Sequence, residues 1–164
     1  MKTLRLILIY LTMLIIVVAC SDEKVKEEII LSEGIPDFVR KSDFEKINWE
    51  NKAVEFGNRG IIGNENKSGV IGADAPSLAS QKWMWHLWGV PVGVEMTVVG
   101  FHRKTKEVHQ ILNWPEWTIQ MGGPNNGADA QAPSCVKIPE TGEWAILLYI
   151  DGNLFDTLIF KINE

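Results

Sequence analysis

Cysteine is scarce in this chain of 164 residues, occurring only at positions 20 and 135. Two cysteines cannot build a disulfide framework or a multi-cysteine metal cluster. A basic excess is also missing, because Lys and Arg total 16 against 21 Asp and Glu. Without residues 1–19, which contain Lys2 and Arg5 and no acid, 14 basic side chains face 21 acidic ones. The resulting net charge of −7, with no basic stripe, argues against nucleic acid as a partner.

Sequence motifs of enzymes are missing too. The chain has no G-x-S-x-G, no H-E-x-x-H, no phosphate-binding glycine loop before a helix and no EF-hand spacing. The remaining enzymatic alternative is Cys135 as a nucleophile, which would need a base and an orienting group. No His or acid is close to it in sequence, and Val136 and Ile138 follow it, so we interpret Cys135 as a buried structural cysteine. The sequence thus predicts no catalytic residue, cofactor or metal ligand.

The N-terminus predicts an export signal. Lys2 and Arg5 precede an apolar run, residues 6–18, that is short for a permanent membrane span. Residues 17–20, Val-Val-Ala-Cys, resemble the lipobox of bacterial lipoproteins. That resemblance implies cleavage before Cys20, attachment of lipid to the Cys20 thiol, and anchoring on the extracytoplasmic face of the cell membrane. Two acyl chains suffice for stable anchoring.

The pattern divides the chain into three parts: a signal peptide over 1–19, a lipidated cysteine and flexible tether over 20–36, and a folded domain over 37–164. The tether is rich in charge and ends near Gly34 and Pro36. Segment 37–52 fits neither the helical nor the strand period, so its structure is left open.

From Ala53 onward, short apolar runs alternate with Gly, Pro and Asn. Strands at this spacing without helical crossovers predict an all-β domain, an antiparallel two-sheet sandwich of immunoglobulin type. A closed barrel uses the same alternation and remains the alternative.

The last two strands, 142–150 and 154–162, allow their register to be predicted. Their large apolar residues fall at even numbers, so Trp144 should face Phe160 and Ile146 should face Leu158. Strict alternation then requires a three-residue loop, 151–153, instead of a two-residue Asp-Gly turn. The opposite face is also fairly apolar, so we expect it to be partly covered.

Three histidines, His86, His102 and His109, raise the question of a metal pair. His102 and His109 would face each other only across a two-residue loop. The even-numbered apolar residues of segments 92–102 and 107–114 instead favour a loop of three, 104–106. His102 then faces Val108, and His109 lies on the other face beside Phe101. A metal pair is therefore not predicted, and His86 is expected to be hydrogen-bonded at a sheet surface.

Tryptophan is abundant, with seven residues. Trp85 and Trp144 are expected in the core, with Trp83 on the same face as Trp85. Trp114 and Trp117 flank Pro115-Glu116 at an expected turn and are the candidates for exposure. Exposed indoles can stack on sugar rings, so these two residues could bind cell-wall glycan.

Residues 122–133 form a long stretch of small and polar residues. Long loops in compact domains often serve binding, and Asn125, Asn126 and Asp129 are its candidate ligand-binding residues. The alternative is an ordered crossover between the sheets. A calcium site there would be poor in carboxylates, and we do not predict one.

Residues 82–89, 122–134 and 138–155 together resemble a group of small bacillus-type lipoproteins that contain a domain of unknown function. The resemblance covers about residues 56–164; Lys106, where glycine is commoner, departs from it. It implies an all-β domain on the outer face of the membrane and supplies no active-site residue. We therefore expect a non-enzymatic binding or interaction module, with a wall glycan or a surface protein as its partner. A glycan-binding domain with exposed tryptophans and an enzyme based on Cys135 are the alternatives.

Overall fold

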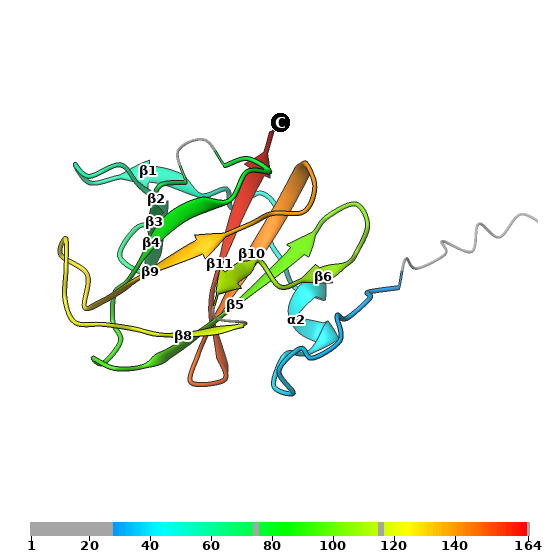
Figure 1. The fold of residues 1–164 in the computed structure, drawn as a ribbon, viewed down its shortest axis with the longest axis horizontal. Coiled ribbons are helices and arrows are strands. Elements are labelled where there is room, and N and C mark those ends of the chain that lie inside the picture. The colour runs from blue at the N-terminus through cyan, green and yellow to red at the C-terminus, as the bar shows by residue number, and fades with distance from the viewer. Residues whose placement is uncertain (1–27, 74–75, 115–116, 164) are drawn as a thin grey trace, which may run out of the picture.

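The computed structural model describes residues 28–73, 76–114 and 117–163, which form two antiparallel sheets packed face to face (Figure 1). One sheet has the strand order β1 (Val54–Phe56), β2 (Ile61–Asn64), β3 (Ser68–Ile71), β4 (Gln81–Leu87), β9 (Ala130–Val136) and β7 (Leu112–Trp114). The other has the order β11 (Asn153–Ile162), β10 (Gly142–Ile150), β5 (Glu95–His102) and β6 (Val108–His109), with β8 (Thr118–Gln120) also paired to β5. One short helix, α2 (Lys41–Glu45), accompanies them.

The prediction of an all-β, antiparallel two-sheet sandwich is confirmed. As in immunoglobulin domains, the two sheets enclose a core of inward-facing side chains. Strands β1 to β4 form a four-stranded meander, and the chain then alternates between the sheets. None of the helices among the described residues is long and apolar enough to span a membrane.

In hairpin β10–β11, even-numbered residues of one strand pair with even-numbered residues of the other up to Leu148, as predicted, but the connecting turn differs from the prediction. Trp144 pairs with Phe160 and Ile146 with Leu158, as predicted. The three-residue loop is wrong, however, because Ile150 pairs with Asn153 and leaves a two-residue Asp151-Gly152 turn. Both turn residues have positive φ, 46° and 78°, as a type I′ turn requires. A register shift beyond Leu148 supplies the extra residue, so a β-bulge restores the even pairing.

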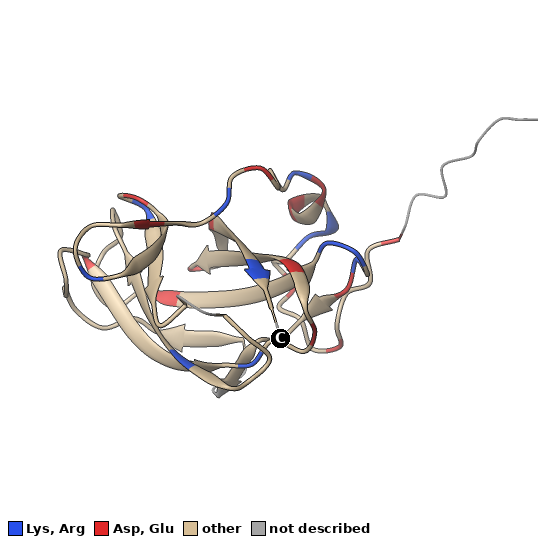
Figure 2. Ribbon diagram, turned by 90° about the horizontal axis from the view of Figure 1, so that it is seen from above, with Lys and Arg blue, Asp and Glu red and all other residues tan. Residues whose placement is uncertain are grey.

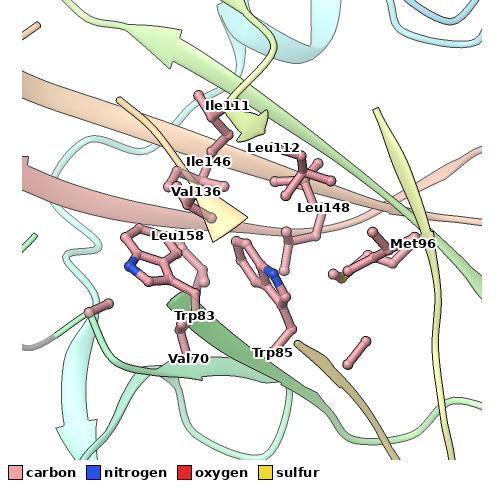
Figure 3. Packing of buried hydrophobic residues seen from close by; sticks show 14 of the residues in the cluster. Val70, Trp83, Trp85, Met96, Ile111, Leu112, Val136, Ile146, Leu148 and Leu158 are labelled. Atoms are coloured by element: carbon pink, nitrogen blue, oxygen red, sulfur yellow. The ribbon is translucent and has the colours of Figure 1, made fainter. Parts of the chain in front are cut away.

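The main core lies between the sheets and is filled by indoles. Trp83, Trp85 and Trp144 are fully buried, which confirms the predicted core positions. The rings of Trp83 and Trp85 lie 5.5 Å apart, edge to face, and Trp85 Nε1 donates to Ser134 Oγ at 2.7 Å. Figure 3 shows both rings between β4 and the aliphatic side chains of the opposite sheet, Ile146, Leu148 and Leu158. Each indole thus buries a large apolar area in this core.

A second apolar cluster covers the outer face of β5 and β10. Leu147, Tyr149, Val99 and Phe101 on the strands contact residues that precede β1 in the chain: Ile29, Leu31, Ile35, Phe38, Val39, Phe44, Ile47 and Trp49. Tyr149 Oη donates to Asp43 Oδ2 at 3.1 Å, and burial, with the Asp43 carboxylate beside it, raises the pKa of Tyr149 far above its usual range. The expected cover of this face is therefore present.

The domain begins earlier than the predicted boundary at residue 36. Ile30 forms a parallel bridge with Glu107, and its amide donates to the Lys106 carbonyl at 3.0 Å. Val108 returns a hydrogen bond to the Ile30 carbonyl. Residues 28–36 are therefore not a flexible tether. Apolar side chains at 29, 31 and 35 bind them to the sheet, a role that their charged surroundings conceal in the sequence.

Segment 107–114, expected as one strand, consists of two strands in different sheets. Val108 on β6 belongs to the second cluster, whereas Leu112 on β7 belongs to the main core. The even-numbered apolar residues of this segment therefore do not share a face.

Phe44 provides a test of the second cluster. It is 3 % exposed and its ring lies 4.8 Å from that of Phe101. Phe44→Ala should lower the free energy of unfolding of the full chain by about 3 kcal/mol, because it leaves a cavity beneath α2. Urea unfolding in detergent, followed by tryptophan emission, measures the change. Val54→Ala, at a side chain that is 59 % exposed, should change it by less than about 0.5 kcal/mol. Equal effects of the two substitutions would contradict this account of the cluster.

Candidate functional site

The predicted tryptophan platform is not formed as expected. Trp117 is only 7 % exposed and packs in the second cluster, so its predicted exposure is wrong. The outer face of β5 is covered, and Trp117, directly before β8, is part of that cover. The side chain of Trp114 lies outside the described part of the structure. A flat surface made by both indoles is therefore excluded.

The three candidate residues of the 122–133 loop do not converge on one ligand. Asn125 and Ala128 form a bridge around Asn126 and Gly127, whose positive φ values, 52° and 83°, indicate a type I′ turn. Asn126 Nδ2 lies 3.0 Å from His86 Nε2, and Asp129 Oδ2 accepts a hydrogen bond from the Gly89 amide at 2.7 Å. Both polar side chains thus hold the loop to neighbouring chain, which fits an ordered connection and not a calcium site.

His86 is fully buried and hydrogen-bonded at both ring nitrogens. Nδ1 lies 3.0 Å from the Met84 carbonyl, and Nε2 faces Asn126. Burial lowers the pKa of His86, although the hydrogen bond to Met84 opposes that shift. A neutral imidazole, donating from Nδ1 and accepting at Nε2, satisfies both contacts. The predicted hydrogen bonding of His86 is confirmed, although its ring is fully buried instead of lying at an open sheet surface.

Cys135 is exposed, so its predicted burial is wrong. It lies on β9 opposite Lys82, and burial alternates along β9 so that Ser134 and Val136 face inward. The apolar neighbours that suggested burial therefore belong to the other face of the strand. Among the described residues, no hydrogen bond or ion pair joins Cys135 to a histidine or a carboxylate.

A polar groove lies where β2 and β3 meet β11. Its volume is about 570 Å³ and it is lined by Glu50, Asn51, Lys52, Val54, Gly63, Asn64, Glu65, Lys67 and Asp156. The Asp156 side chain is 8 % exposed and accepts hydrogen bonds from Asn64 Nδ2 at 3.0 Å and from Ser68 Oγ. Lys67 Nζ lies 3.8 Å from Asp156 and over the Phe155 ring. Fixed carboxylate and amide groups therefore form the inner wall, and exposed charges of both signs form the rim.

The two histidines of the β5–β6 hairpin lie on one face, contrary to the predicted register. Gly100 pairs with His109 and Phe101 with Val108, so four residues, 103–106, connect the strands. His102 is therefore opposite Glu107, not Val108, and Lys106 takes the left-handed conformation (φ 60°). The rings of His102 and His109 lie 4.9 and 5.4 Å from the indole of Trp144.

Charged side chains are otherwise dispersed. Lys and Arg alternate with Asp and Glu along the loops and strand ends (Figure 2). Glu143, for example, is paired with both Lys52 and Arg103, and their hydrogen bonds lower its pKa.

Comparison with known proteins places the domain in a family. A family model described as a domain of unknown function, DUF4871, matches residues 38–160. The chain belongs to the DUF4871 family. A search of curated proteins finds no match. Among solved structures, the DUF4871 domain resembles the crystal structure of a candidate lipoprotein from Bacillus anthracis, with a TM-score of 0.63 and 15 % identity over 78 % of this chain and 96 % of the other. At that identity the likeness concerns the fold.

Sequence reasoning missed the groove of this DUF4871 domain. Asn64 and Ser68 are about 90 residues from Asp156, and none of the three belongs to a motif. The one available signal was Asp156 itself, a charged residue at an inward-facing even position of the last strand.

Cys135 offers a direct test of the outer face of β9. In the native full chain, its thiol should react with Ellman's reagent at a rate close to that seen in urea, because the side chain is exposed. All chains in this test contain Cys20→Ser, so that Cys135 is the one thiol present. The signal should disappear when Cys135→Ser is added, and that variant should fold normally. A thiol that reacts only after unfolding would contradict the assigned orientation of β9.

Proposed function

We propose that this protein is a lipid-anchored, extracytoplasmic binding module without enzymatic activity, and that it binds a polar ligand from the cell wall in the groove at Asp156. The groove is the observation on which the proposal rests. Its inner wall is held by hydrogen bonds from Asn64 and Ser68 to Asp156, so its polar groups are positioned before a ligand arrives.

The composition of the groove favours a ligand that has both hydroxyl or amide groups and charges. Lys52 and Lys67 can bind carboxylates, while Glu50 and Glu65 can bind ammonium groups. Asn51 donates from Nδ2 to Asn64 Oδ1 at 3.3 Å, and its own amide oxygen can accept from hydroxyl or peptide groups of a ligand. Wall muropeptides combine amino sugars with charged peptides and match this set. A sugar-binding role thus needs no platform formed by Trp114 and Trp117.

The anchor is supported by the lipobox-like residues before Cys20. The resemblance in fold to the candidate lipoprotein from Bacillus anthracis is consistent with it. The absence of enzymatic activity is proposed because, among the described residues, no hydrogen bond or ion pair joins Cys135, the nucleophile considered from the sequence, to a histidine or carboxylate that could act as its base.

The anchor is tested by Cys20→Ser in the full chain expressed in a Gram-positive host. The wild-type chain should fractionate with membranes and incorporate labelled palmitate, whereas the variant should incorporate none. Cys135→Ser is the matched control and should behave as wild type. Equal labelling of Cys20→Ser and wild type would contradict lipidation at Cys20.

The groove is tested by Lys67→Ala, measured by calorimetric titration of soluble muropeptides into the detergent-solubilised chain. Loss of one charged hydrogen bond should weaken binding by about tenfold. Lys82→Ala removes another exposed lysine, on β4 and outside the groove, and should leave the affinity unchanged. Equal affinities of wild type and Lys67→Ala, or no binding by wild type, would refute this ligand site.

A further inference from the structure

The geometry points to a second site, for a divalent transition-metal ion, formed by Glu107, His109 and Glu140. These three residues belong to no recognised metal-binding motif in the sequence. One ligand atom from each of these three residues lies within 4.8 Å of the others. Glu107 and His109 come from the β6 segment, and Glu140 comes from the loop between β9 and β10. The register of β5 and β6 and the path of that loop bring the three residues together.

His109 offers a ring nitrogen suited to coordination. Its Nε2 is shielded from solvent and has no hydrogen-bond partner among the described residues, although Glu107 Oε2 lies 3.4 Å away. A buried polar atom without a partner is uncommon in native proteins. A metal ion held between this nitrogen and the two carboxylates would provide the missing interaction, and the negative charges of Glu107 and Glu140 would neutralise it.

Glu140 is oriented by residues behind it. His102 Nδ1 lies 2.9 Å from Glu140 Oε1, and the His102 ring, only 3 % exposed, stacks on Trp144. Gly142 packs over the same ring, where an added Cβ would lie 2.5 Å from His102 Nε2. Glu140 Oε1 also accepts a hydrogen bond from Thr105 Oγ1 at 3.5 Å. Both contacts fall on Oε1, so Oε2 retains its acceptor positions for a metal. Supporting hydrogen bonds of this kind commonly orient metal ligands.

Small movements of the ligands suffice to close the site. Tetrahedral coordination by nitrogen and oxygen at 2.0–2.2 Å requires ligand atoms about 3.4 Å apart. The side chains of Glu107 and Glu140 are 42 % and 41 % exposed, so their carboxylates can approach His109 by rotation. A hollow of about 240 Å³ next to His109, lined also by Lys137 and Pro139, gives access from solvent.

One imidazole and two carboxylates favour Zn²⁺ or a similar first-row ion over Ca²⁺ or Mg²⁺, which prefer oxygen ligands alone. Three protein ligands leave a coordination position for water or for a group of another molecule. The site is separate from the Asp156 groove and does not depend on the function proposed for it.

The test is calorimetric titration of ZnCl₂ into the metal-depleted full chain in detergent. All chains contain Cys20→Ser and Cys135→Ser, so that neither thiol can bind zinc. The parent should bind one Zn²⁺ per chain, and saturating Zn²⁺ should raise its unfolding temperature. His109→Ala and Glu140→Gln should each weaken binding at least about tenfold and remove the temperature shift.

Two control variants match these changes. Glu95→Gln removes an exposed carboxylate that lies outside the site, at the start of β5. Lys67→Ala changes a residue of the Asp156 groove, and both variants should bind Zn²⁺ like the parent. His109→Gln and Glu107→Gln serve as milder changes if His109→Ala does not fold. No saturable binding to the parent, equal affinity in the ligand variants, or equal affinity for Ca²⁺ would overturn the assignment.

Discussion

Burial of β10 on both of its faces is the constraint on which the rest of the structure depends. Trp144, Ile146 and Leu148 point to one side, Ala145 and Leu147 to the other, and all five are fully buried. A strand of this kind needs two apolar partners. The six-stranded sheet covers one side, and the segment before β1 covers the other. The sandwich is therefore incomplete as a folding unit without residues 28–52, although these contain only five residues of regular helix.

In hairpin β10–β11, the sequence predicted correctly which residues share a face but not the loop that connects the two strands. The face that each residue occupies follows from the alternation of apolar residues, and this alternation alone predicted the pairing of Trp144 with Phe160. The length of the turn depends instead on the local backbone preferences of its residues. Asp151 and Gly152 form the two-residue turn that their residue types favour. This turn alone would shift the register by one residue, and the bulge beyond Leu148 compensates for that shift. A strict alternation rule cannot predict a bulge, because the extra residue leaves no pattern of its own.

The register of the β5–β6 hairpin was predicted wrongly for a different reason. The apolar residues of segment 107–114 pack in two different clusters. Val108 packs outside the sheet and Leu112 inside the sandwich. Gly100 is part of this arrangement, since an added Cβ there would lie 2.5 Å from Ile111 Cγ2. Ile111 thus occupies the place that a side chain at position 100 would take, and His109, opposite Gly100, lies against Trp144. Only the three-dimensional path of residues 109–112 explains why both histidines share this indole.

The candidate sites were less predictable than the core because both are assembled from distant segments. Asp156 meets Asn64 and Ser68 only once the two sheets have packed, and Glu140 meets His109 only through the β9–β10 loop. Trp117, Cys135 and Asp129 were chosen for local reasons, and the surroundings of each were set by contacts far along the chain. Local sequence identifies which face a residue occupies more readily than what covers that face.

The position of β6 connects the proposed anchor with the proposed metal site. β6 is two residues long and lies at a sheet edge, where Ile30 pairs with Glu107 on its open side. Ile30 is the tenth residue after Cys20, which limits the distance between the two residues to about 35 Å even in a fully extended chain. An anchor at Cys20 would therefore hold the site close to the membrane surface. An ion joining Glu107 to Glu140 would also tie β6 to the loop that connects the two sheets. This bond would reinforce the edge at which a pull on the anchor enters the domain.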